Sequence, residues 1–175
     1  MTRHLLWPIL LGLFILQGTL VSWLMPPVWQ TRVFVTPHFM LVFILFIGLF
    51  IHRHTALVLG LIFGLLSDLI NYGHMLGIYS FGMGLTGYLA GLVQRRQPNL
   101  LFYNLLIVGG GVLLFELNNY GLNRLFNTMN TDFKFAFTHF MLPSVLFNLL
   151  FALIIYVPAR KLLERMAPLP EGDED

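Results

Sequence analysis

Charged residues and cysteine are what this sequence has least of. Asp, Glu, Lys and Arg make up only 10% of the 175 residues, whereas a soluble domain carries about 25%. A water-facing surface needs those charges, so the chain is not expected to fold as a soluble domain. The absence of cysteine excludes disulfides, thiolate nucleophiles and cysteine-ligated metal sites. The net charge of +2 is too small to indicate a nucleic-acid-binding protein.

Apolar runs fill most of the chain, because 57% of the residues are hydrophobic. In hydrocarbon each backbone amide must be satisfied within its own segment, which favours helices, and about 20 residues cross a bilayer. The sequence therefore predicts an all-α integral membrane protein, a bundle of six transmembrane helices over residues 1–165, with a short, disordered acidic tail at 166–175. The predicted spans are about residues 5–24, 33–51, 55–70, 76–93, 100–122 and 140–157.

The sequence also predicts where the spans begin and end and where the longest connections lie. Pro37 lies near the start of the second span, and Pro158 is expected to end the sixth. The longest connections are expected at residues 25–32 and 123–139. The first run is interpreted as a span, since a cleaved signal peptide has a shorter core of about 7–15 residues.

The distribution of Lys and Arg predicts the orientation. Short cytoplasmic loops retain these residues. With the N-terminus inside, seven of the ten basic residues are cytoplasmic and three are outside. Both termini are therefore predicted to be cytoplasmic, with an even number of spans. The seven are Arg3, Arg53, Arg95, Arg96, Arg160, Lys161 and Arg165, and the three are Arg32, Arg124 and Lys134.

Glycines recur at helical spacing in the third and fourth spans. Gly60 and Gly64 share a helix face, and Gly84, Gly87 and Gly91 form a second stripe. Small residues let neighbouring helices approach closely in a membrane, so these five glycines are predicted helix-packing positions.

Two acidic residues lie inside predicted spans, and both fall in the outer half of the bundle. Asp68 continues the face of Gly60 and Gly64, while Glu116, Asn119 and Asn123 follow one another on a polar stripe with Tyr120. A carboxyl group near hydrocarbon must be paired, wet or protonated. Asp68, Glu116, Asn119 and Asn123 are therefore candidates for a polar cavity that opens outward, or for a structural seam against a partner.

An enzyme is not expected. The sequence has no His-Glu-x-x-His pair and no glycine-rich loop ending in Gly-Lys-Ser/Thr. The six histidines fall at span ends or in loops, and Ser67-Asp68 has no histidine at a depth suited to nucleophilic catalysis. No metal or cofactor is predicted.

The third and fourth spans resemble the rod shape-determining protein MreD family of bacteria. The shared pattern is Gly-x3-Gly-Leu-Leu-x-Asp-Leu at 60–69, Leu-Gly at 76–77 and Gly-Tyr-Leu-Ala-Gly at 87–91. Pro37 and Glu116 also fit the family. His38 departs from it, since many relatives carry an acid there, and this puts any role for that position in doubt.

The resemblance implies a scaffold or regulatory component, without enzymatic activity or cofactor, of the machinery that builds the lateral peptidoglycan wall and maintains rod shape. The expected location is the bacterial plasma (cytoplasmic, or inner) membrane, in contact with membrane lipid. The expected partners are an MreC-like single-span protein and, directly or indirectly, MreB-like filaments and the elongation glycosyltransferase–transpeptidase pair. Nucleic acid is not among them.

The family also resembles in fold the six-helix substrate-binding subunits of energy-coupling-factor transporters. The alternative function is therefore a small-molecule-binding subunit with an outward pocket near Asp68 and Glu116. Those subunits commonly carry an Ala-x3-Ala stripe on the first helix, where the energising module docks. Here the first alanine is Ala56, which favours the scaffold.

Overall fold

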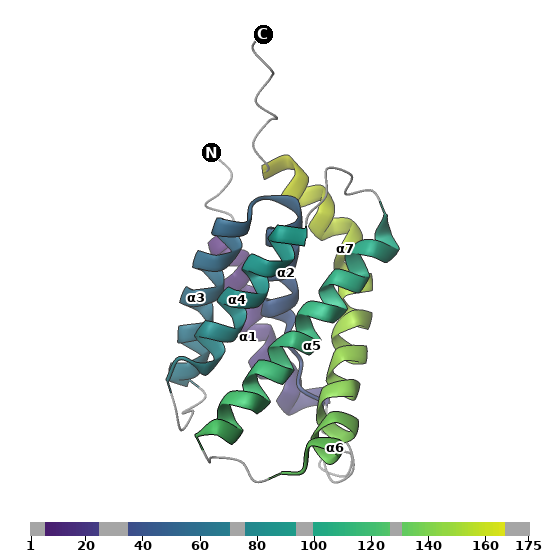
Figure 1. Ribbon diagram of the computed structural model, residues 1–175. Helices are drawn as coiled ribbons and strands as arrows, with labels where there is room; N and C mark the ends of the chain where they lie inside the picture. Colours follow the sequence, from purple (N-terminus) through teal and green to yellow (C-terminus); the bar gives the residue numbers. More distant parts are fainter. Residues whose placement is uncertain (1–5, 25–34, 71–75, 94–99, 127–130, 167–175) are drawn as a thin grey trace.

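The computed structural model describes residues 6–24, 35–70, 76–93, 100–126 and 131–166, which form helices and no strand. Figure 1 shows them as a bundle. The elements are α1 (Leu6–Leu24), α2 (Phe39–Phe50), α3 (Arg53–Ile70), α4 (Ile78–Val93), α5 (Leu101–Leu125), α6 (Phe133–Ala136), a π-helical segment (Phe137–Met141) and α7 (Leu142–Met166).

The predicted all-helical fold is confirmed, and the six predicted spans each contain an apolar helix. Three continuous helices are long and apolar enough to cross a membrane, namely Arg53–Ile70, Leu101–Leu125 and Phe133–Met166. Three apolar helices are shorter, namely Leu6–Thr19, Phe39–Phe50 and Ile78–Val93. The predicted tail at 166–175, apart from Met166, lies outside the described residues.

The bundle has two distinct ends. The start of α1, the α2–α3 turn and the end of α7 lie together (top of Figure 1); we name this the basic end, for Arg53, Arg160 and Arg165. The end of α3, the start of α4, the end of α5 and α6 lie at the other end, which we name the polar end, for Asp68, Asn123 and Asp132. Since the first and last helices meet at one end, the arrangement fits an even number of crossings.

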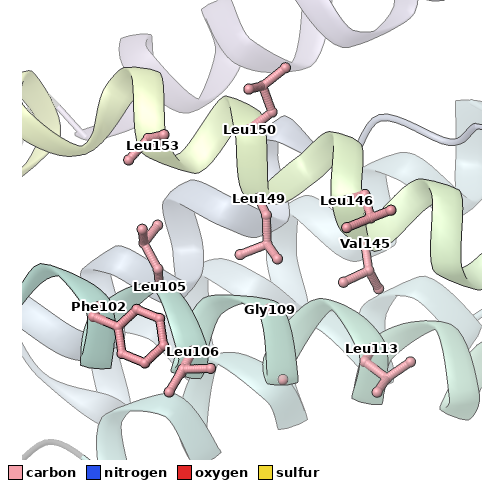
Figure 2. A pocket seen from close by; sticks show the side chains of 11 residues that line it. Phe102, Leu105, Leu106, Gly109, Leu113, Val145, Leu146, Leu149, Leu150 and Leu153 are labelled. Atoms are coloured by element: carbon pink, nitrogen blue, oxygen red, sulfur yellow. The ribbon is translucent and has the colours of Figure 1, made fainter.

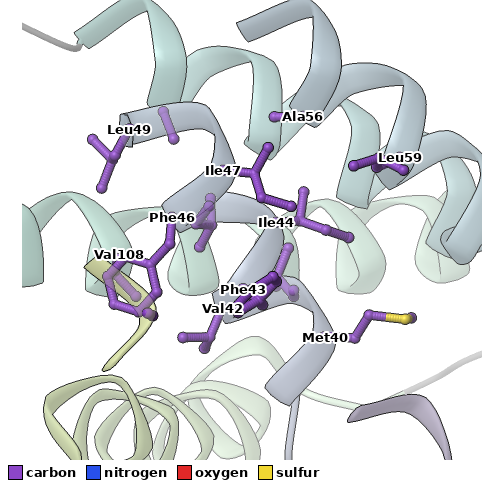
Figure 3. Packing of buried hydrophobic residues seen from close by; sticks show 14 of the residues in the cluster. Met40, Val42, Phe43, Ile44, Phe46, Ile47, Leu49, Ala56, Leu59 and Val108 are labelled. Carbon is purple, nitrogen blue, oxygen red and sulfur yellow. The ribbon is translucent and has the colours of Figure 1, made fainter. Parts of the chain in front are cut away.

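Helix α2 is the centre of the bundle. All residues from Phe39 to Phe50 are buried, and α2 contacts α1, α3, α4, α5 and α7. Its apolar side chains point in several directions, toward α3 at Ala56 and Leu59 and toward α5 at Val108 (Figure 3). A helix that is apolar on all sides is suited to this central position.

The start of α2 differs from the prediction. A span from about residue 33 was expected, but residues 35–38 are not helical and α2 begins at Phe39. Pro37 explains the difference: it has no N–H to donate, and it disfavours helical geometry in the residue before it.

Helix α7 supplies the hydrogen bonds that this non-helical segment needs. The Thr36 N–H donates to Ser144 Oγ at 3.0 Å, and the His38 N–H donates to Asn148 Oδ1 at 2.7 Å. Asn148 Nδ2 in turn donates to the Thr36 carbonyl at 2.9 Å. Irregular backbone at membrane depth is tolerated where protein groups satisfy it, and Asn148, which is buried, does so on both sides of Pro37.

The sixth span is also longer than predicted. The helix was expected to end at Pro158, but it runs without a break from Phe133 to Met166. Proline removes one backbone hydrogen bond, which a membrane helix tolerates, and the continuation buries Leu163 and Met166. Because α5 extends to Leu125 as well, most of the connection expected at 123–139 is helical.

Close contacts join α2, α3 and α4 at the predicted glycines. A Cβ atom at Gly60 would lie 2.7 Å from the carbonyl oxygen of Met83, and one at Gly91 would lie 2.6 Å from Cβ of Arg53. Gly64, Gly84 and Gly87 have similarly close neighbours at 2.5, 2.9 and 2.8 Å. Gly48 of α2, which the sequence pattern did not single out, approaches α4 in the same way.

Candidate functional site

Asp68 joins the end of α3 to the start of α4. Its Oδ2 accepts the N–H of Gly77 at 2.9 Å and of Ser80 at 3.1 Å, and its Oδ1 accepts the N–H of Tyr79 at 3.1 Å. The first N–H groups of a helix have no partner within the helix, and a carboxylate there also interacts favourably with the helix dipole. The buried Asp68 therefore acts as a cap for α4.

The turn before α4 is shaped to reach this carboxylate. Gly77 has a φ of +104°, a left-handed conformation that side-chain-bearing residues rarely adopt. Ser80 adds a second link between the two helices, because its Oγ donates to the Leu61 carbonyl at 2.8 Å.

Glu116 of α5 pairs with His38, the residue before α2. His38 Nε2 and Glu116 Oε1 are 2.9 Å apart, and the two side chains are 1% and 12% exposed. His38 Nδ1 is buried and has no hydrogen-bond partner. An N–H there would be an unsatisfied buried donor, which is costly, so we assign the neutral tautomer in which Nε2–H donates to Glu116. In this assignment Glu116 Oε1 is the acceptor.

A cavity of about 170 Å³ lies beside Glu116 at the polar end. Glu116, Asn119 and Asn123 line it, and Asn123 Nδ2 donates to Asn119 Oδ1 at 2.8 Å. The π-helical segment contributes Phe140 and Met141 to the lining. Short π-helical turns occur frequently at functional sites. The remaining lining residues are Thr36, Tyr120 and Ala136.

The structure thus brings three of the four predicted polar residues together. Asp68 does not line the cavity, because its carboxylate is bound to the start of α4. Ring contacts connect the two positions: Tyr79 packs on Phe115 with ring centres 5.5 Å apart, and Phe115 packs on His38 at 4.9 Å. Among the described residues, no group of three or more His, Cys, Asp or Glu side chains could hold a metal ion.

Comparison with known proteins shows the family to which this chain belongs. Residues 1–166 match the family described as rod shape-determining protein MreD. The chain belongs to the MreD family. It is 32% identical over 124 residues to the rod shape-determining protein MreD of Bacillus subtilis (strain 168), a match that covers 71% of this chain and 72% of that protein. No solved structure matches the chain.

Membership of the MreD family explains why the helices are so apolar. The family match and the apolar helices together identify a multi-pass membrane protein with a role in rod shape determination. The resemblance found in residues 60–91 is confirmed, and it extends over nearly the whole chain.

Two residues important to the site of this MreD family member were missed from the sequence. His38 was noted only as a departure from the family pattern, yet it orients Glu116. Asn148 was not singled out at all, although it binds the backbone on both sides of Pro37. A polar residue within a long apolar run was the available signal in the case of Asn148, because such residues are expensive in a membrane unless paired.

Proposed function

We propose that this chain is a non-catalytic scaffold of the bacterial cell-elongation machinery, which binds an MreC-like single-span protein within the plasma membrane and so maintains rod shape. Through that partner it associates, directly or indirectly, with MreB-like filaments and with the glycosyltransferase–transpeptidase pair that makes lateral peptidoglycan. Membership of the MreD family is the observation that carries the proposal. The surface of the bundle suggests where a partner helix binds.

A groove of about 540 Å³ runs between α5 and α7 on the outside of the bundle. Figure 2 shows its two walls facing each other, leucines of α7 on one side and α5 with Gly109 on the other. Its residues are all apolar: Phe102, Leu105, Leu106, Gly109, Gly110, Leu113, Val145, Leu146, Leu149, Leu150 and Leu153.

The two glycines make this groove suited to a helix. Gly109 is packed against Leu149, whereas a Cβ atom at Gly110 would meet nothing within 4 Å. In a membrane, helices associate through close packing at small residues rather than through the hydrophobic effect. The exposed backbone at Gly110 therefore gives a partner helix a place to approach α5 closely.

The Gly110→Leu variant tests this surface. The new Cβ atom meets nothing within 4 Å, and the side chain extends into the groove. We expect normal abundance and thermal stability, with co-purification of the MreC-like partner reduced about tenfold, which corresponds to about 1.4 kcal/mol. Gly121→Leu is the matched control, since Gly121 is also on α5 and also has open space at Cβ. Equal partner recovery from both variants would show that the partner binds elsewhere.

Both termini are proposed to be cytoplasmic, because seven of the ten Lys and Arg residues then lie inside. A reporter active only in the cytoplasm should be active when fused after Asp175 and inactive when inserted after Arg124. An inactive fusion after Asp175 together with an active insertion after Arg124 would reverse the proposed orientation. This experiment is independent of partner binding.

The transporter-subunit alternative has less support. Small-molecule sites usually have volumes of about 300–1,000 Å³, and the polar cavity is near 170 Å³. The transporter alternative placed an outward pocket near Asp68, but the Asp68 carboxylate is held by three backbone N–H groups. The cavity is nevertheless large enough for a small polar group.

A further inference from the structure

The polar cavity holds a carboxylate that the chain itself only half satisfies. Glu116 Oε1 accepts from His38, and within the described residues Oε2 makes no hydrogen bond. None of the eight lining residues is basic. A carboxyl group with one oxygen unpaired in a largely buried site is unfavourable unless a cation or a further donor reaches it. The cavity therefore favours a ligand with a positively charged hydrogen-bond donor.

The walls of the cavity limit the shape of that ligand. Ala136, Phe140 and Met141 are the apolar residues among those that line the cavity. A volume of about 170 Å³ exceeds what a bare metal ion needs. A primary ammonium on a short alkyl chain matches both features, since its nitrogen can reach Glu116 while its methylene groups contact the apolar wall.

A positive charge is fixed just outside the cavity. The exposed Arg124 donates from Nη1 to the hydroxyl of Tyr120, a lining residue, at 2.7 Å, and its Cζ lies 5.9 Å from the centre of the Tyr120 ring. Lys134 of α6 is exposed at the same end of the bundle. Arginine pairs strongly with phosphate. The site thus presents a carboxyl group inside and a positive charge at the rim.

This order of charges matches a phospholipid headgroup with an ammonium at its tip and a phosphate behind it. We propose that the cavity binds the headgroup of phosphatidylethanolamine, with the ammonium on Glu116 and the phosphate on Arg124. A lysine side chain of a protein partner would satisfy Glu116 but would leave Arg124 without an anion. The position also fits a lipid, because the charged residues Arg124, Asp132 and Lys134 mark the polar end of an apolar bundle.

The proposal predicts a definite order among lipids. Phosphatidylcholine cannot donate a hydrogen bond from its trimethylammonium group, and phosphatidylglycerol has no cation for Glu116. In detergent, the short-chain dihexanoyl form of phosphatidylethanolamine should raise the melting temperature of the full chain more than the dihexanoyl forms of the other two. In native mass spectrometry the apparent affinity should be higher by at least about tenfold, as expected for one charged hydrogen bond.

Three variants test the assignment of charges. Glu116→Gln keeps an acceptor for His38 and should abolish the preference for phosphatidylethanolamine. Arg124→Gln should weaken all three phospholipids alike. Asp132→Asn is the control and should keep the preference, because Asp132 is an exposed carboxylate at the same end that does not line the cavity.

Two results would overturn the proposal. One is an equal response to the three lipids, or a preference that Glu116→Gln leaves intact. The other is a shift of full size from free O-phosphoethanolamine at the same concentration, which would assign the site to a soluble aminoalkyl phosphate instead of a lipid. Neither result depends on whether the MreC-like partner binds in the α5–α7 groove.

Discussion

Asp68→Leu is expected to unfold the α3–α4 pair, whereas Asp68→Asn should retain much of its stability. Leucine removes the acceptor of three backbone N–H groups, those of Gly77, Tyr79 and Ser80. Each buried donor left unsatisfied costs about 1–3 kcal/mol, and these are only partly buried, so we expect a loss of about 3–5 kcal/mol. Asparagine keeps one oxygen acceptor and should lose about 1–2 kcal/mol.

Melting in detergent and abundance in the membrane measure this order, which should be wild type, then Asp68→Asn, then Asp68→Leu. Asp132→Leu is the control, because Asp132 precedes α6 but makes no capping hydrogen bond with its side chain. The capping role is contradicted if the Asp68→Leu variant has the same melting temperature as the wild type. Equal losses in the leucine and asparagine variants would show instead that the negative charge is essential.

Gly64→Leu should be nearly as damaging, for a steric reason. A Cβ atom at Gly64 would lie 2.5 Å from Cα of Ser80 and 2.7 Å from the carbonyl oxygen of Tyr79. Both neighbours are backbone atoms, so no rotamer change relieves the overlap and α3 must move away from α4. Overpacking typically costs about 1–3 kcal/mol, and we expect about 3 kcal/mol or more here because the clash begins at Cβ.

The comparison for this variant is Gly12→Leu on α1, where a Cβ atom meets nothing within 4 Å. Both variants add the same side chain to a membrane helix, so a difference between them reports on helix contact rather than on hydrophobicity. Gly64→Leu should lower the melting temperature and the amount of protein in the membrane, while Gly12→Leu should change neither. Identical melting of the two would mean that the α3–α4 contact is not tight in the membrane.

The features predicted correctly from the sequence are the ones encoded locally. Apolar runs of nearly constant hydropathy show where helices form, because the bilayer imposes one length scale on all of them. The spacing of Gly60 and Gly64 within one helix shows which face meets a neighbour. The motif over residues 60–91 was enough to indicate the family, which the match over residues 1–166 confirms.

The features missed depend on partners distant in the sequence. Pro37 marks an interruption, but the interruption is stabilised by Ser144 and by Asn148, which accepts the N–H of His38 from 110 residues away. The same holds for His38 and Glu116, which are 78 residues apart. Asp68 shows the opposite error: a distant partner was expected in the fifth span, whereas its partners lie 9 to 12 residues along the chain. The position of a polar residue along its helix does not reveal whether its partner is near or distant in the sequence, because several polar groups lie at the same depth in the bundle.

The hydrogen bonds between α7 and residues 36–38 have a consequence for biosynthesis. Ser144 and Asn148 lie 108 to 112 residues after the backbone groups that they bind. Ribosomes add about 5–20 residues per second, so the segment around Pro37 waits roughly 5–20 s for its partners after it is made. During that interval α2, which is 12 residues long, has unsatisfied polar backbone at its start and is a poor independent span. Its stable insertion is therefore expected to be a late step that follows synthesis of the C-terminal helix.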